Sequence, residues 1–113
     1  MVAYDVLPEK RLAFFDFVQQ EANALVDNEL HTIHVSTMVD DKEKNRFINL
    51  KIFENKAAYL EHLEGEILNA FLDVVKDMIV SGPTILFEGV NLLTRDDYSL
   101  EENPLDPKVY LTQ

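Results

Sequence analysis

The chain has 113 residues, a net charge of −11 and a pI of about 4.5, a size that suits one domain. Such acidity disfavours binding to nucleic acid or to an anionic membrane surface, because both carry negative charge. The absence of cysteine excludes disulfides, thiolate nucleophiles and zinc–thiolate sites, and it is compatible with the reducing cytoplasm in which we expect the protein.

The first part of the chain is predicted to form a strand and then a helix. Residues 2–7 alternate and are rich in β-formers, and Pro8 ends the strand. The N-terminal residues lack the basic region and following apolar run of a signal peptide, and no apolar run in the chain approaches the roughly 20 residues of a membrane span. Residues 9–27 carry apolar side chains at steps of three and four, which predicts an amphipathic helix. Its expected buried stripe is Leu12, Phe15, Val18, Ala22, Leu25 and Val26, widened by Phe14 and Phe17.

Residues 30–39 and 46–54 are predicted to be two strands of a hairpin, because both alternate and they flank a charged turn at 40–44. In the first strand, the β-branched face is expected to meet the core: His31, Ile33, Val35, Thr37 and Val39. In the second strand, we expect the aliphatic face to pack on the helices: Ile48, Leu50 and Ile52. The other face would then point away from the helices: Phe47, Asn49, Lys51 and Phe53.

Residues 56–80 are predicted to be helical, with a break at Gly65, which lowers helix propensity by about 1 kcal/mol. The expected buried stripe is Leu60, Leu63, Ile67, Phe71, Val74, Val75 and Met78. Ser81-Gly82-Pro83 has the glycine-then-proline chemistry that ends helices, so the fourth strand is expected at 84–93.

We therefore expect one α+β domain at 1–95 and an acidic tail at 96–113, in which residues 108–112 can add a strand to a sheet edge. The β-α-β-β-α-β order is the ferredoxin-like arrangement, a four-stranded antiparallel sheet with both helices on one face. The uncovered face would hold Phe47, Phe53, Met38 and either Tyr4 or Leu7. That face is too apolar for water alone, so we expect a homodimer that closes over it as a dimeric α/β barrel.

Phe53 is followed by Glu54-Asn55, Ala57-Ala58 and His62, and then by Gly65-Glu66 and Phe71. This run resembles the antibiotic biosynthesis monooxygenase family of dimeric α+β barrels, in which a strand ends on acid-x-Trp and a His follows an Ala by one turn. Gly82-Pro83 and Phe87-Glu88-Gly89 are also similar to that family, including its autoinducer-phosphate isomerase branch. The resemblance covers roughly residues 1–93.

The chain departs from the family pattern in several places, among them Lys51, which replaces the strand acid, and Ile67, which replaces a second His. The haem-degrading relatives need an axial His near the later helix, where this chain has Phe71 or Leu72. We therefore expect no haem, no other cofactor and no metal.

His34, Asn49 and Lys51 are expected to line one pocket on the sheet face away from the helices. A neutral His beside a Lys can act as a general base near pH 7, and Lys51 and Asn49 can hold an enolate or phenolate oxygen. The resemblance adds His62 as a proton carrier. The catalytic candidates are thus His34, Lys51 and His62, and the substrate-binding candidates are Asn49, Phe47, Phe53, Met38 and Tyr4.

Each candidate also has a plainer interpretation, in which His34 and Lys51 are polar residues on a wet face and His62 pairs with Glu66. The resemblance implies a cofactor-independent monooxygenase of the antibiotic biosynthesis or quinol type, acting on a small aromatic or polyphenolic substrate. An isomerase on the same scaffold and a non-catalytic dimer that binds a small ligand remain as alternatives. Convergence of Lys51 and His34 on an enclosed cavity would favour catalysis, whereas a cavity filled by Phe47 and Phe53 would favour binding.

Overall fold

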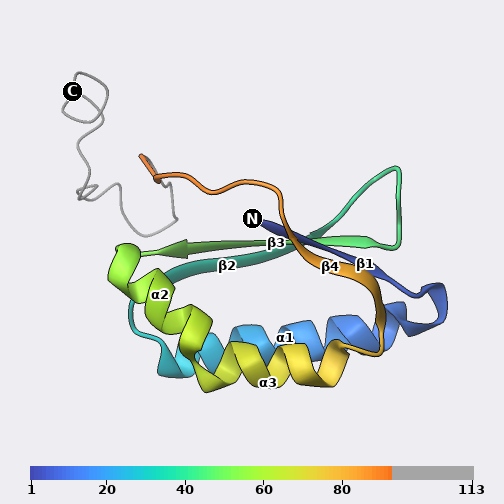
Figure 1. Ribbon diagram of the computed structural model, residues 1–113, viewed down its shortest axis with the longest axis horizontal. Helices are drawn as coiled ribbons and strands as arrows, with labels where there is room; N and C mark the ends of the chain where they lie inside the picture. Colours follow the sequence, from blue (N-terminus) through green and yellow to red (C-terminus); the bar gives the residue numbers. More distant parts are fainter. Residues whose placement is uncertain (93–113) are drawn as a thin grey trace.

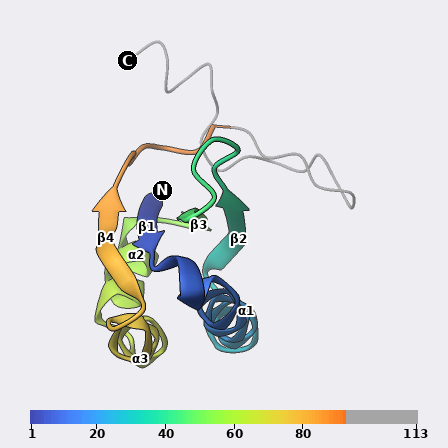
Figure 2. The same ribbon diagram turned by 90° about the vertical axis from the view of Figure 1, so that its right-hand side faces the viewer.

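The computed structural model describes residues 1–92, which form a four-stranded antiparallel sheet with its helices on one face (Figure 1). The strands are β1 (Val2–Val6), β2 (Thr32–Val39), β3 (Arg46–Phe53) and β4 (Ile79–Ile85). The helices are the short 3₁₀ turn η1 (Pro8–Lys10), α1 (Arg11–Asn28), α2 (Lys56–Glu64) and α3 (Glu66–Val75). The strand order β2-β3-β1-β4 confirms the ferredoxin-like prediction, and Figure 2 shows the opposite sheet face without a helix.

The face that helix α1 turns to the sheet overlaps the predicted stripe and is rotated from it. Its buried side chains are Phe14, Val18, Glu21 and Leu25, at steps of four, three and four. Leu12 and Val26, both predicted to be core residues, are 83% and 71% exposed. Apolar residues cover a wide arc of this helix, and periodicity within the helix cannot say which part of the arc meets the sheet. The prediction for this helix was therefore right in extent, right at Phe14, Val18 and Leu25, and wrong at Leu12 and Val26.

Four aromatic side chains form the centre of the core and fix the phase of α1. The Phe14 ring centroid lies 5.4 Å from that of Tyr4, 5.0 Å from that of Phe47 and 5.9 Å from that of Phe71. Tilted and edge-to-face ring pairs of this kind add to the stabilisation from apolar burial. Burial raises the pKa of the Tyr4 phenol well above its usual value, with a smaller contribution from Glu21. Tyr4 and Phe47 are thus core residues, and the prediction that they occupy the uncovered face was wrong.

Strand β3 presents its two faces the opposite way from the prediction. Phe47 and Asn49 are buried, and the Lys51 side chain reaches Glu21 on α1, so this face meets the helices. The aliphatic residues at 48, 50 and 52 alternate with them and lie on the uncovered face. Both faces carry apolar residues, and the choice between them depends on contacts with residues distant in the sequence.

The hairpin prediction is confirmed, with β2 antiparallel to β3, and most of the predicted core face of β2 does point to the helices. Val35 is paired with Lys51 and Thr37 with Asn49, so these side chains share the helix-facing side. A register shift between Thr32 and His34 changes the alternation at the start of the strand. Ile33 is consequently exposed, contrary to the prediction.

The break at Gly65 is confirmed, since α2 ends at Glu64 and α3 starts at Glu66. The predicted helix end was wrong, because β4 already begins at Ile79 and contains Gly82-Pro83. Gly82 has a φ of +116°, and a Cβ there would lie 2.6 Å from the Ala3 carbonyl oxygen. Glycine is therefore required by the close approach of β4 to β1 and does not end the helix. The predicted domain boundary at 95 and the predicted tail strand lie outside the described residues.

In α2 and α3, the predicted stripe is correct at Phe71 and Val75, which are buried. The other buried residues of these helices are Ala58, His62 and Leu68. Leu60, Leu63 and Val74 are exposed, contrary to the prediction. His62 is therefore buried on α2, whereas its neighbours Leu60 and Leu63, which were predicted to be buried, are exposed.

Truncation of one residue from each side of α1 tests which face of α1 is buried. Phe14→Ala removes a fully buried ring and is expected to lower the free energy of unfolding by about 3 to 5 kcal/mol. Leu12→Ala, its control on the exposed side of the helix, should change it by no more than about 0.5 kcal/mol. Urea denaturation followed by circular dichroism measures both, and equal losses would contradict the observed phase.

Candidate functional site

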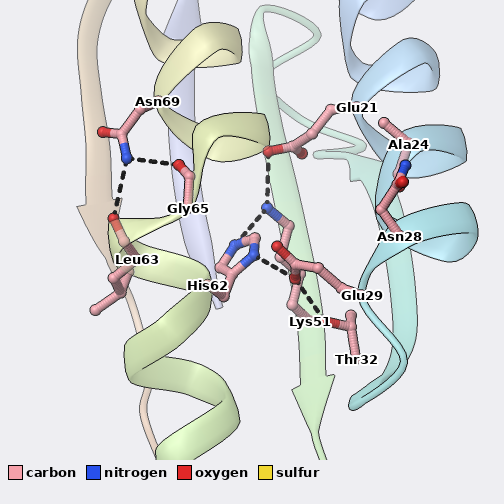
Figure 3. A network of polar contacts seen from close by, with 10 residues as sticks. All are labelled: Glu21, Ala24, Asn28, Glu29, Thr32, Lys51, His62, Leu63, Gly65 and Asn69. Atoms are coloured by element: carbon pink, nitrogen blue, oxygen red, sulfur yellow. Dashed lines mark hydrogen bonds and ion pairs between the residues drawn. The ribbon is translucent and has the colours of Figure 1, made fainter.

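A chain of polar side chains crosses the layer between the sheet and the helices (Figure 3). Lys51 Nζ donates to Glu21 Oε2 at 3.0 Å and lies 3.3 Å from His62 Nε2. On the other side of the imidazole, His62 Nδ1 lies 2.9 Å from Glu29 Oε1, which also accepts a 2.7 Å hydrogen bond from Thr32 Oγ1. We call these five residues the Lys51 network.

Four different parts of the fold supply the Lys51 network. Glu21 comes from the buried stripe of α1, and Glu29 follows the last residue of that helix, where its backbone N–H donates to the Leu25 carbonyl at 2.8 Å. Thr32 and Lys51 come from β2 and β3. His62 is in the last turn of α2, a helix whose first turn is capped by the Asn55 side chain, which accepts from the Ala58 N–H.

Burial controls the charge state of the network. Glu21 and Lys51 have side chains that are only 1% and 11% exposed. Desolvation raises the pKa of the Glu21 carboxyl, and the Lys51 ammonium partly offsets that rise. Desolvation and Lys51 lower the pKa of His62, against an opposing effect of Glu29. At neutral pH the His62 imidazole is therefore uncharged, next to a buried ion pair.

Two buried polar atoms beside the ion pair have no hydrogen-bond partner among residues 1–92: Glu21 Oε1 and Asn49 Nδ2. The Asn49 side chain is held by its other end, since Oδ1 accepts from Thr37 Oγ1 at 2.8 Å. Glu21 Oε1 can therefore accept a hydrogen bond from a hydroxyl such as that of a water molecule, and Asn49 Nδ2 can donate one to an oxygen atom.

A groove of about 310 Å³ opens at the Glu29–His62 end of the Lys51 network. Its lining residues are Asn28, Glu29, Leu30, His31, Thr32, Ala58, Glu61 and His62. The lining includes two carboxylates and two imidazoles and has no Lys or Arg, which gives the groove an acidic character. Three members of the Lys51 network are therefore among the residues that line the groove: Glu29, Thr32 and His62.

Aromatic rings cover the other side of His62. The Phe53 ring centroid lies 5.0 Å from the imidazole and 5.3 Å from the Tyr59 ring. Tyr59 in turn donates its hydroxyl to Glu88 Oε1 at 2.8 Å, which ties α2 to the segment after β4. Phe53 was expected on the uncovered face and instead packs beside His62.

The structure brings together some of the predicted site residues and separates others. Lys51 and His62 are in contact, with Asn49 and Phe53 next to them on the same side of the sheet. The shared pocket predicted for His34, Asn49 and Lys51 was wrong, because His34 pairs with Ile52 on the uncovered face and its ring contacts the Ser36 hydroxyl.

Met38 is paired with Ile48, also on the uncovered face, so it is apart from the Lys51 network. Tyr4 and Phe47 belong to the aromatic core. His62 contacts Glu29, and the predicted pair with Glu66 is not formed.

Glu21 and Glu29 were not among the predicted site residues. Glu21 continues the spacing of Phe14, Val18 and Leu25, so an acid on an apolar stripe would have indicated it once the phase of α1 was known. Glu29 lies in a turn, where a carboxylate is ordinary, and its proximity to His62 depends on the packing of α2 against the end of α1. The local sequence therefore indicated a buried role for Glu21 and gave no indication of the role of Glu29.

Within residues 1–92, no group of three or more His, Cys, Asp or Glu side chains is arranged to hold a metal ion. In the same part of the chain, none of the helices has both the length and the apolar character needed to cross a membrane.

Comparison with known proteins gives a family match and several similar folds. The profile of the antibiotic biosynthesis monooxygenase family matches residues 1–74. A candidate monooxygenase from Fusobacterium nucleatum superposes with a TM-score of 0.64 at 22% identity over 71% of this chain, which spans 36% of that protein. Nothing among curated proteins matches the chain.

Two further solved structures match over most of their own length. A candidate antibiotic biosynthesis monooxygenase from Nitrosomonas europaea has a TM-score of 0.67 and 16% identity, with coverage of 72% of this chain and 77% of that one. Another from Bordetella bronchiseptica has a TM-score of 0.69 and 13% identity, with coverage of 80% and 93%. At these identities the likeness establishes the fold.

A double-mutant cycle tests the buried ion pair. Lys51→Met leaves the Glu21 carboxylate buried without its partner and is expected to lower the free energy of unfolding by about 3 to 5 kcal/mol. The double variant Glu21→Leu with Lys51→Met removes both charges and should recover most of that loss. Chemical denaturation at pH 7 measures the cycle, and simple additivity of the two single changes would contradict the pairing.

Proposed function

Because the chain belongs to the antibiotic biosynthesis monooxygenase family, we propose that it is a cofactor-independent monooxygenase acting on a small, neutral aromatic or polyphenolic hydroxyl compound. One observation carries the proposal: an uncharged His62 is held between Lys51 and Glu29 where the Lys51 network meets the groove. An imidazole in that state can take up a proton, which is the first requirement for oxygenating a phenol.

In the proposed reaction, the groove holds the substrate and the network takes the phenolic proton. The resulting phenolate is electron-rich enough to reduce O₂. One oxygen atom then bonds to a ring carbon and becomes a quinone carbonyl, and the other leaves as water with the two hydrogens lost by the substrate. Lys51 is the cation of the network, and it adds its positive charge from behind the imidazole at Nε2, outside the lining of the groove, while the Phe53 ring packs beside His62.

The charge of the groove favours this reaction over the isomerase alternative. An isomerase for a phosphorylated sugar needs cationic side chains or free backbone amides to hold the phosphate. The groove is lined by Glu29 and Glu61 and by no Lys or Arg, so a dianionic phosphate would be repelled. A neutral hydroxylated ring is the better match.

Oxygen uptake with a panel of hydroquinones and naphthols tests the proposed activity. We expect wild-type turnover with one quinone formed for each O₂ consumed, and no hydrogen peroxide. His62→Ala should lower kcat by about 100-fold or more, the usual contribution of a general acid–base group. His34→Ala, on the uncovered face, is the matched control and should retain wild-type kcat.

The outcomes of this assay separate the functional alternatives. Absence of oxygen uptake for every compound would contradict the monooxygenase. Conversion of a compound without oxygen uptake would support the isomerase, and saturable binding without conversion would support a ligand-binding protein.

We also propose that the protein is a homodimer closed over the uncovered sheet face. That face carries aliphatic residues of β3 and exposed Met38 on β2, which favours cover by an apolar partner surface. Membership of a family of dimeric barrels supports the same assembly. A second copy is the simplest partner, since it presents an identical face.

Sedimentation velocity tests the dimer and the face that forms it. The wild-type protein should sediment as a dimer at micromolar concentration, and Leu50→Glu, which places a charge on the uncovered face, should sediment as a monomer. Leu12→Glu, on the exposed side of α1, is the control and should remain dimeric. A monomeric wild type, or a dimer in Leu50→Glu, would overturn the proposal.

A further inference from the structure

We infer that Glu29 is a positioning residue for His62: its carboxylate holds the imidazole in the tautomer that carries hydrogen on Nδ1 and leaves Nε2 as the acceptor. This inference rests on the proposed function only for its catalytic consequence. It assigns a function to a residue that lies in a turn between α1 and β2 and that the family pattern does not include.

The partners of the two ring nitrogens determine the tautomer. Glu29 Oε1, 2.9 Å from Nδ1, belongs to a carboxylate, which can only accept a hydrogen bond. Lys51 Nζ, 3.3 Å from Nε2, belongs to an ammonium, which can only donate. A neutral ring satisfies both partners only with its hydrogen on Nδ1 and its lone pair on Nε2.

Glu29 is the stronger of the two constraints. Its contact with the ring is shorter than that of Lys51, whose ammonium is already engaged by Glu21 at 3.0 Å. The Glu29 carboxylate is itself fixed, because the Thr32 hydroxyl donates to the same Oε1 atom at 2.7 Å. The backbone fixes it further, since the Thr32 N–H donates to the Glu29 carbonyl at 3.2 Å.

Gly65, at the break between α2 and α3, lies close to Glu29. A Cβ at Gly65 would lie 3.5 Å from Glu29 Oε2, which is an ordinary van der Waals distance, and 3.3 Å from the carbonyl oxygens of Glu61 and His62. The Glu29 carboxylate therefore packs beside the helix break, next to the last turn of α2 where His62 lies.

The arrangement also connects the groove to the buried part of the network. The His62 side chain is 3% exposed, whereas that of Glu29 is 20% exposed and lines the groove. The Glu29 carboxylate is therefore the more accessible of the two groups, and it holds the less accessible imidazole through Nδ1. Loss of this contact should disorder the ring without emptying the groove.

Long-range ¹⁵N–¹H correlation spectra of the His62 ring test the inference directly. The wild-type protein should show the Nδ1–H pattern at pH 7.5, and Glu29→Ala should replace it with a mixture in which Nε2–H is present. Glu29→Gln, whose amide oxygen can still accept from Nδ1–H, should retain the wild-type pattern. Glu61→Ala removes the other groove carboxylate, which is not a hydrogen-bond partner of the His62 ring, and should leave the Nδ1–H pattern unchanged.

A Nδ1–H pattern that persists in Glu29→Ala would overturn the inference, as would a Gln variant that behaves like the Ala variant. Thr32→Val removes the hydroxyl that holds Glu29 and provides a milder variant should Glu29→Ala fail to fold. It is expected to give a detectable share of Nε2–H, and an unchanged spectrum would count against the inference.

Kinetics then separate this inference from the proposed function. With an active wild type, kcat should fall at least tenfold in Glu29→Ala and recover in Glu29→Gln, with KM nearly constant in both. A wild type without oxygenase activity would overturn the proposed function, and the tautomer spectra would still decide the position of Glu29.

Discussion

The burial of Lys51 between the sheet and the helices is the interaction on which the rest of the site depends. An ammonium group that is 11% exposed needs an anionic partner, which Glu21 supplies from the buried stripe of α1. That pair fixes the phase of α1 and the side of β3 that meets the helices. Burial lowers the pKa of His62, and the same ammonium adds to that lowering, so the buried cation helps to keep the imidazole uncharged.

Much of the fold could be predicted from local signals, because those signals act over a few residues. The charged turn at 40–44 predicts a hairpin, and Gly65 interrupts a helical pattern. The phase of α1 and the faces of β3 could not be predicted in this way. Each of these elements has apolar residues on both sides, and the choice is made by the aromatic core around Phe14 and by the Lys51–Glu21 pair.

The candidate site was predictable in part for the same reason. Lys51 and His62 stood out, one as a departure from a family pattern and the other as its match. Their contact with each other depended on the helix-facing side of β3, which was predicted to be the uncovered one. Glu29 gave no local signal because its importance comes from three elements that meet at the end of α1. His34 looked equivalent to His62 in the sequence and lies on the opposite face of the sheet.

The candidate site depends on the side of the sheet to which Lys51 points. Nuclear Overhauser contacts from the Lys51 ε-methylene protons measure this in solution on the wild-type protein. We expect contacts to the His62 ring protons and to the Glu21 γ-methylene, since Lys51 Nζ lies 3.3 Å from His62 Nε2 and 3.0 Å from Glu21 Oε2. Contacts to the His34 ring, with none to His62, would place Lys51 on the uncovered face and contradict the account.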